Sequence, residues 1–300
     1  MRKGIISVVL LILVCISCNR KNTESQNYTQ GSSTIIADES FAPVLEDQLL
    51  VFRDNYPKAH LRMIYKPENE LLNYFMNDSV GVVVMSRLLN PDEKKVFENK
   101  KVVIRVNRFA IDAIALIINQ SAADTVVEVS DIINVMQGRK SRIKSLVFDN
   151  ANSSTVRYLK ELSDIKDLPA SGVYALKSNP EVIRFVHDNP GAIGVVGVNW
   201  MEQPEKDMQA YVDKLRMIAV KNLPGKPGSD QYYMPDQDHI AAGLYALTRD
   251  LYIINCSGGP GVGGGFAAFL AGEKGQRIVL KSGLVPDKIP SREILIRNKL

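Results

Sequence analysis

The chain has 300 residues, 45% of them apolar, and a formal net charge of +4 from 37 basic and 33 acidic side chains. This length and apolar content allow a large buried core and favour two lobes over one. The charge is nearly balanced, and no basic run is interleaved with aromatic residues, which argues against a nucleic-acid-binding protein. Recognition of an anion would therefore have to come from a local site.

Histidines and cysteines give no sign of a metal site. His60, His187 and His239 are far apart in the sequence and lack the spacing of metal ligands, so we expect neither a metal nor another cofactor. Of the three cysteines, only Cys256 lies outside the first eighteen residues, so an intramolecular disulfide framework is impossible in the mature chain. Stability must come from packing.

The N-terminus has the pattern of a signal peptide over residues 1–17. Arg2 and Lys3 precede an apolar run, 5–16, that is too short to span a bilayer. The small residue before Cys18 resembles the lipobox of bacterial lipoproteins, which implies that Cys18 is the acylated first residue of the mature chain. Cys15 stands where that motif usually has Leu or Val, and an uncleaved anchor or an ordinary signal peptide is the alternative.

Residues 18–32 are polar and are expected to form a lipid-bearing tether. Removal of residues 1–17 leaves 35 basic and 33 acidic side chains, because that segment contains two basic residues and no acidic one. The mature chain therefore remains close to neutral.

The rest of the chain alternates between strand and helix patterns. Strands are expected at residues 33–37, 61–65, 80–85, 112–119, 143–148, 192–198 and 215–221. Helices are expected at residues 41–52, 68–76, 129–137, 154–162, 181–188 and, as one long region, 266–281. The glycine-rich run 258–265 lacks the ending of a P-loop and predicts a turn. This alternation predicts an α/β fold with largely parallel sheets.

Two lobes are predicted, joined by extended segments near 112–119 and 215–222. The first lobe would comprise residues 33–113 and 220–300, and the second lobe residues 114–219. In open α/β sheets ligands bind outside the carboxyl ends of the strands, so a cleft between the lobes is the expected site.

Three loops at such strand ends carry hydroxyl groups. They are Asp38-Glu39-Ser40-Phe41, Ser86-Arg87, and residues 149–155. In the third loop, Ser153-Ser154-Thr155 opens a helix and offers backbone N–H groups, hydroxyls and the positive end of the helix dipole, which suits a tetrahedral oxyanion. Taken alone, a simple N-cap explains this run better. The guanidinium fork of Arg87 suits phosphate-like oxygens.

Together these motifs resemble the phosphate-binding protein of bacterial high-affinity phosphate ABC transporters. The resemblance spans about residues 33–286 and depends on the order of several short motifs. They are Ser40-Phe41-Ala42-Pro43, Ser86-Arg87, Asp112-Ala113-Ile114-Ala115, Ser153-Ser154-Thr155, the run 191–197 and the tail 269–286. It implies the type II periplasmic-binding-protein fold, in which two lobes hinged by two strands close on the ligand.

The resemblance also implies a set of phosphate-binding residues: Ser40, Phe41, Ser86, Arg87, Asp149, Ser153, Ser154 and Thr155. Compared with the family, Arg87 and Asp149 have exchanged places, and the family's Gly-Ser-Ser loop has no counterpart. An ionised Asp149 can only accept hydrogen bonds, so it would favour phosphate, which retains a proton near neutral pH, over sulfate, which has none. The alternative is that Arg87 and Asp149 pair and brace the closed lobes.

The function implied by the resemblance is that of a solute-binding protein and not of an enzyme. It would bind inorganic phosphate as a monomer and deliver it to an ABC permease in the inner membrane, held by its lipid anchor on the periplasmic side of the cell envelope. Three alternatives remain open: an oxyanion sensor that contacts a receptor, a binding protein for sulfate or molybdate, and a hydrolase. No nucleophile–base pair in the sequence supports the hydrolase.

Overall fold

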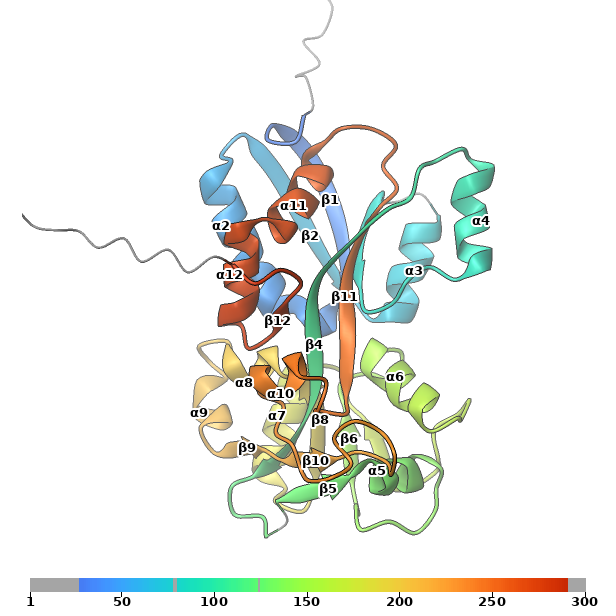
Figure 1. Ribbon diagram of the computed structural model, residues 1–300, viewed down its shortest axis with the longest axis vertical. Helices are drawn as coiled ribbons and strands as arrows, with labels where there is room; N and C mark the ends of the chain where they lie inside the picture. Colours follow the sequence, from blue (N-terminus) through green and yellow to red (C-terminus); the bar gives the residue numbers. More distant parts are fainter. Residues whose placement is uncertain (1–26, 78–79, 124, 291–300) are drawn as a thin grey trace, which may run out of the picture.

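The computed structural model describes residues 27–77, 80–123 and 125–290. The predicted signal peptide and Cys18 lie outside the described residues. Two α/β lobes are stacked along the long axis, and one strand, β4 (Arg105–Asn119), runs through both (Figure 1). The expected two-lobed α/β fold is confirmed.

The first lobe is a sheet with helices on both faces. Three parallel strands, β2 (Ala59–Lys66), β1 (Gly31–Asp38) and β3 (Val82–Met85), lie in that order, and β11 (Thr248–Asn255) joins β3 to β4 by antiparallel pairing. The short β12 (Val285–Pro286) pairs with β4. The helical elements are η1 (Glu39–Phe41), α2 (Ala42–Asn55), α3 (Glu68–Met76), α4 (Pro91–Asn99), α11 (Val262–Ala271) and α12 (Glu273–Lys281).

Strand β1 shows why this sheet is covered on both faces. Successive side chains of a strand point to opposite faces. Ile35 and Ala37 pack in one core cluster with Phe52 of α2 and Phe266 of α11, whereas Ile36 packs in another cluster with residues of α3 and α4. Figure 1 shows α2, α11 and α12 on one side of the sheet and α3 and α4 on the other.

The second lobe repeats this plan with shorter strands. Strands β7 (Val173–Ala175), β6 (Leu146–Phe148) and β8 (Ile193–Gly197) are parallel, and β8 and β9 (Leu215–Met217) pair antiparallel with β4. A separate pair is formed by β5 (Val126–Glu128) and β10 (Ala219–Lys221). The helices are α5 (Val129–Met136), α6 (Ser154–Leu162), α7 (Asn179–Asp188), α8 (Asn199–Glu202), α9 (Gln209–Val212) and α10 (Gln237–Ala241).

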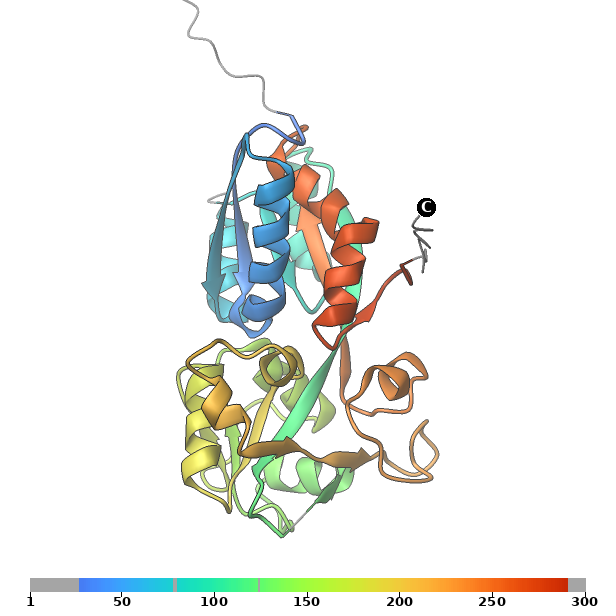
Figure 2. The ribbon, with the colours of Figure 1, turned by 90° about the vertical axis from the view of Figure 1, so that its left-hand side faces the viewer.

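The hinge differs from the expectation at its second strand. Residues 215–221 form two short strands inside the second lobe, because β9 pairs with the end of β4 and β10 pairs with β5. The chain returns to the first lobe only at β11, where Thr248 is opposite Ala113. Residues 222–247 lie beside the second lobe (Figure 2), and Tyr245 donates a hydrogen bond to the Ile114 carbonyl at 2.8 Å. The second crossing is therefore near residue 248 and not near 215–222.

The glycine-rich run also differs from the expected turn. Its second half opens α11, and a Cβ atom on Gly263 would clash with Val82, while one on Gly265 would lie 1.8 Å from the Tyr28 carbonyl oxygen. These glycines permit close packing of the helix against β1 and the N-terminal turn. The expected helical region 266–281 is divided because the backbone at Gly272 is extended.

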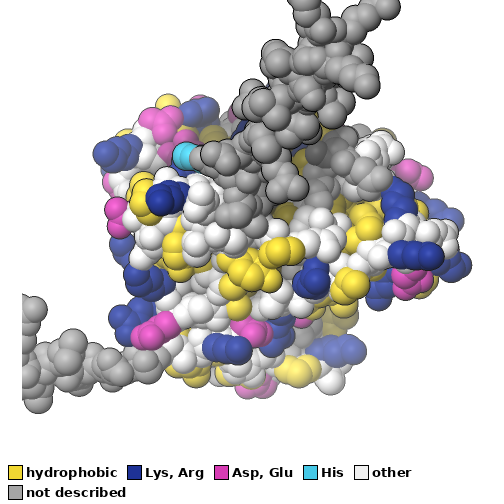
Figure 3. Space-filling view, turned by 90° about the horizontal axis from the view of Figure 1, so that it is seen from above, with side chains coloured by type: hydrophobic (Ala, Val, Ile, Leu, Met, Phe, Trp, Pro, Cys, Tyr) yellow, Lys and Arg dark blue, Asp and Glu magenta, His cyan; other side chains and the backbone are white. Residues whose placement is uncertain are grey.

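The surface carries both signs of charge. Viewed from the end of the first lobe, basic, acidic and apolar side chains are interspersed (Figure 3). This agrees with the small net charge. Within the described residues, none of the helices has the length and apolarity needed to cross a bilayer.

Candidate functional site

Two loops from opposite lobes meet beside the hinge. Strand β1 ends at Asp38, whose Oδ1 accepts a hydrogen bond from the Ser40 N–H at 2.9 Å, and this contact shapes the η1 turn. Ser40 and Phe41 are fully buried. From the second lobe, Asp149 follows β6 and approaches Ser40, with the Ser40 Oγ 3.4 Å from the Asp149 Oδ2. The first predicted loop therefore faces the third.

Helix α6 begins where the sequence predicts. The Ser153 Oγ accepts from the Val156 N–H at 3.2 Å as an N-cap and donates to Asp149 Oδ1 at 2.7 Å. Ser154 and Thr155 occupy the first turn and are fully buried. Backbone N–H groups in the first turn of a helix have no partner within the helix, which makes this end of α6 positive. Because Ser153 contacts Asp149 and Ser154 contacts Arg249, this positive end lies at the junction of the lobes.

Arg249 supplies the positive charge of the site. It lies in β11 opposite Asp112 of β4, and its Nε donates to Asp112 Oδ2 at 2.8 Å. Its Nη1 donates to Ser154 Oγ at 2.9 Å and to Thr155 Oγ1 at 3.3 Å, and its guanidinium lies 4.6 Å from the centre of the Phe41 ring. One cation on the hinge thus contacts both lobes.

Three buried carboxyl groups surround this arginine. Asp38, Asp112 and Asp149 are fully buried, and burial raises the pKa of each, an effect that Arg249 partly opposes. Glu39 lies next to them, and burial followed by the nearby Asp149 raises its pKa to about 7. Burial therefore makes ionisation of these carboxyl groups less favourable than in water.

Asp149 is saturated by donors from the chain itself. Its Oδ1 accepts from Ser153 and from the Asn150 N–H, and its Oδ2 accepts from Ser40 and from Asn179. A carboxylate has about four lone-pair sites, so little capacity remains for a ligand. Asp149 holds the two loops together in this arrangement.

Other buried polar atoms at the junction retain capacity. Among the described residues, no hydrogen-bond partner is found for Arg249 Nη2, Asp38 Oδ2, Asp112 Oδ1, Asn179 Oδ1 or Asn199 Oδ1. Buried polar groups are normally hydrogen-bonded. A donor on Arg249 and acceptors on two carboxyls therefore remain for a small polar guest.

Ser86 and Arg87 occupy a different network from the one expected. Arg87 forms a two-point hydrogen bond with Glu93, at 2.7 and 2.8 Å, and lies 3.5 Å from Glu68. Ser86 accepts from Arg157 of α6 at 3.1 Å. The pairing of Arg87 with Asp149 considered above is not present, because Glu93 is only six residues away and engages the arginine within its own lobe.

The two lobes are in direct contact around the junction. Trp200 of α8 donates its indole N–H to the Ser40 carbonyl at 2.9 Å, and Asn199 approaches the same carbonyl at 3.4 Å. Asn69 of α3 donates through both its backbone and its side chain to Asn152, each at 3.3 Å. This is a closed arrangement of the lobes.

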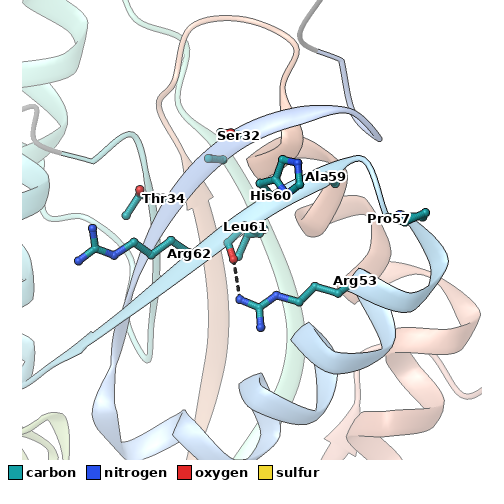
Figure 4. A pocket seen from close by; sticks show the side chains of 9 residues that line it. Ser32, Thr34, Arg53, Pro57, Ala59, His60, Leu61 and Arg62 are labelled. Atoms are coloured by element: carbon teal, nitrogen blue, oxygen red, sulfur yellow. Dashed lines mark hydrogen bonds between the residues drawn. The ribbon is translucent and has the colours of Figure 1, made fainter. Parts of the chain in front are cut away.

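A separate hollow of about 850 Å³ lies on the outer edge of the first lobe. Figure 4 shows it beside the edge strand β2, with Arg53 donating to the Leu61 carbonyl at 2.9 Å and His60 and Arg62 on the strand. It is open to solvent and lies far from the hinge, so its size does not make it the functional site. No cluster of three or more metal-ligating side chains is found within the described residues.

The sequence does not single out Arg249, Asp38 or Asp112 as site residues, although Asp38 lies in the first predicted loop and Asp112 in one of the motifs that carry the resemblance. Arg249 is missed because no strand is predicted at residues 248–255. The signal was present, since Leu251 to Ile254 is a run of β-favouring residues that closely follows an arginine. Of the predicted residues, the structure brings together six: Ser40, Phe41, Asp149, Ser153, Ser154 and Thr155.

Comparisons with known proteins identify the family. Residues 22–274 match the family model described as the PBP superfamily domain. No curated protein sequence matches the chain.

Solved structures of similar fold come from several functional classes. One named as a putative phosphate ABC transporter substrate-binding protein, from Clostridium perfringens with bound phosphate, has 19% identity, covers 86% of this chain and 100% of its own, and gives a TM-score of 0.68. An ABC-type phosphate transport receptor from Vibrio cholerae has 16% identity, 85% and 100% coverage and a TM-score of 0.63. A variant of the OxyR2 regulatory domain from Vibrio vulnificus has 11% identity, 81% and 97% coverage and a TM-score of 0.55.

These identities are low enough that the structural likenesses bear on the fold alone. They agree with the type II periplasmic-binding-protein architecture, two α/β lobes with β4 and β11 crossing between them. With a family match over residues 22–274, the chain belongs to the PBP superfamily.

Proposed function

We propose that this protein is the phosphate-binding component of an ABC transporter. It captures inorganic phosphate between its lobes and delivers it to a membrane permease, acting as a binding protein and not as an enzyme. The observation that carries the proposal is Arg249, a buried guanidinium beside the hydroxyls of Ser154 and Thr155 at the start of α6. Its Nη2 has no hydrogen-bond partner in the part of the chain that the structure describes. Two of the three structures compared above carry phosphate transport in their names.

The proposed ligand contacts combine donors from both lobes. Arg249 Nη2, the hydroxyls of Ser154 and Thr155, and the N–H groups at the start of α6 and at Phe41 would surround the oxyanion. The Ser40 hydroxyl donates to Asp149 and holds the two loops together. Closure needs no chemistry, because a ligand bonded to both lobes favours the closed state. The roles of Ser153 and Asp149 in this scheme are to fix the α6 loop, and those of Ser86 and Arg87 lie in the neighbouring network.

Selectivity for phosphate is assigned to Asp38, in place of Asp149. The Asp38 Oδ2 is fully buried and without a partner among the described residues, whereas Asp149 is already bonded four times. A carboxylate accepts a hydrogen bond from a ligand oxygen that carries a proton, and it repels an oxygen that is fully ionised. Phosphate near neutral pH has such a proton, and sulfate has none.

The setting proposed for this function is outside the inner membrane. The family supports an extracytoplasmic location, and the segment before residue 27 supports a lipid anchor at Cys18. We further propose that the chain acts as a monomer. We also propose lobe boundaries near residues 113 and 248. The second boundary replaces the one expected from the sequence near residue 220.

Calorimetric titration with phosphate and sulfate tests the proposal, with Arg249→Lys and Asp38→Asn as variants. For the wild type we expect one-to-one binding of phosphate and no heat of binding on titration with sulfate. Arg249→Lys keeps the charge but loses the guanidinium fork, and should lower the affinity for phosphate by about 10- to 100-fold. Asp38→Asn removes the carboxylate that would repel sulfate, so this variant should bind sulfate. Absence of phosphate binding by the folded wild type would refute the proposal and favour another oxyanion or a sensor role.

A further inference from the structure

Two charged residues join the lobes at the mouth of the site. Glu68 begins α3 in the first lobe, and Arg157 lies on α6 in the second. Arg157 Nε is 2.5 Å from Glu68 Oε1, and its Nη2 is 3.2 Å from Glu68 Oε2, so the guanidinium contacts both carboxylate oxygens. Glu68 is 1% exposed and Arg157 24% exposed. This is the bidentate geometry of a strong ion pair.

Each partner also has a neighbour within its own lobe. Glu68 lies 3.5 Å from Arg87, which is held in place by Glu93. Arg157 donates to Glu161, one turn further along α6, at 2.9 Å. When the lobes separate, neither charge is left without a counter-ion, because Arg87 stays with Glu68 and Glu161 stays with Arg157. The pair can therefore break and re-form without leaving an unpaired buried charge, which would be strongly unfavourable.

The ion pair is mechanically linked to the ligand site. Arg157 follows Thr155 by two residues on the same helix, and Asn152, one residue before the Ser153 cap, bonds to Asn69 next to Glu68. A ligand that draws the first turn of α6 toward the first lobe therefore also brings Arg157 onto Glu68. In return, the ion pair holds the same turn over the ligand.

We propose that Glu68 and Arg157 form a closure latch that sets how long the ligand stays bound. The latch makes no contact with the ligand in this scheme; it stabilises the closed state in which the ligand is held. This inference rests on the proposed function, since it concerns the lifetime of the phosphate complex. It also assigns Arg87, expected from the sequence as a ligand residue, to keeping Glu68 oriented while the lobes are open.

Stopped-flow fluorescence can measure this lifetime without a label. The chain has a single tryptophan, Trp200, which is buried and bonded across the lobe boundary to Ser40, so its emission is expected to report closure. Arg157→Gln and Glu68→Gln remove the charge of each side chain and leave a polar group, which has the shape of glutamate at position 68 and is shorter than arginine at position 157. We expect either change to raise the phosphate dissociation rate by about 10- to 100-fold, with a much smaller change in the association rate.

The double variant and a control on the same helix sharpen the test. Because the two residues act as one pair, the double variant should dissociate about as fast as the faster single variant. Glu161→Gln removes only the 61% exposed partner of Arg157, and should change the rate by about twofold or less. Thermal unfolding of each variant separates loss of the latch from loss of the fold.

Three outcomes overturn one claim or the other. A folded Arg157→Gln variant with the wild-type dissociation rate refutes the latch and leaves phosphate binding intact. Additive effects in the double variant also refute it, because independent residues would then be responsible. A wild type that binds no phosphate refutes the proposed function first. The lobe separation of the ligand-free variants, measured by small-angle scattering, then still tests the latch, which requires wider separation than in the wild type.

Discussion

At the scale of single residues, the site is decided by one buried arginine among several carboxyls. Arg249 neutralises part of the charge of Asp38, Asp112 and Asp149, which would otherwise be very costly to bury together. It also ties the hydroxyls of Ser154 and Thr155 to the hinge. A small oxyanion with a proton suits the Arg249 Nη2 group and the Asp38 and Asp112 oxygens, which have no hydrogen-bond partner among the described residues.

Glu39 gives a pH-dependent prediction at this scale. Its pKa is raised to about 7 from 4.5, so the folded protein binds a proton there more tightly than the unfolded chain does. The free energy of unfolding should therefore fall as pH rises from about 4.5 to 7, and remain lower above that window. Glu39→Gln should remove this loss. Allowing for solvent screening of a half-buried group, we expect a gain of about 1 kcal/mol at pH 8 over wild type.

Urea unfolding at pH 5 and pH 8 checks this expectation. The difference between variant and wild type should appear at pH 8 and be small or reversed at pH 5. An equal difference at both pH values would show that Glu39 is not the titrating group.

At the scale of elements, close packing fixes where strands and helices lie. Gly194 in β8 permits α7 to approach the sheet, since a Cβ atom there would lie within 2.8 Å of Val186, Ile117 and Val182. This packing positions α7, and with it Asn179, which donates to Asp149. Helix α7, which has no proposed ligand contact, thus still orients the loop that carries the proposed ones.

Gly194→Ala is expected to destabilise the fold by about 1–3 kcal/mol, because the added methyl group overpacks three branched side chains at once. Gly191→Ala, in the loop before β8, is the matched control: no atom lies within 4 Å of its added Cβ, so the midpoint of thermal unfolding should barely change. Equal effects of the two substitutions would contradict the packing argument.

At the scale of the whole molecule, the two crossing strands β4 and β11 connect the lobes, and hydrogen bonds and an ion pair join the lobes beside them. The contacts described above are polar: Glu68 with Arg157, Asn69 with Asn152, and Ser40 with Trp200. Polar contacts of this kind exchange readily with water. Ligand-free molecules should therefore be divided between open and closed states, and the closed state should need the ligand to become dominant.

Small-angle scattering tests this balance. Phosphate should reduce the radius of gyration of the wild type, and the reduction should saturate at one phosphate per chain. Sulfate at the same concentration should leave the radius unchanged. If the radius is already at its phosphate-bound value without ligand, the lobes close on their own and the free energy of closure does not come from the ligand.

Much of the architecture followed from sequence patterns. Helices at 68–76 and 154–162 were predicted at their observed bounds, because amphipathic spacing and N-terminal helix signals act locally. The two-lobed α/β organisation and the meeting of Ser40 with the 149–155 loop also followed, since strand ends in such sheets converge on one edge.

The partners of charged side chains were decided only by the tertiary structure. Arg157 and Arg249 look alike in the sequence, yet in the fold Arg157 pairs with Glu68 and Arg249 with Asp112, both far away along the chain. Arg87 is the local exception, since Glu93 is only six residues away. The choice depends on strand register, such as Arg249 opposite Asp112, and on which strand returns across the hinge. Sequence by itself determined the loops that could hold an oxyanion; long-range pairing, which no local pattern encodes, determined which cation stands among them.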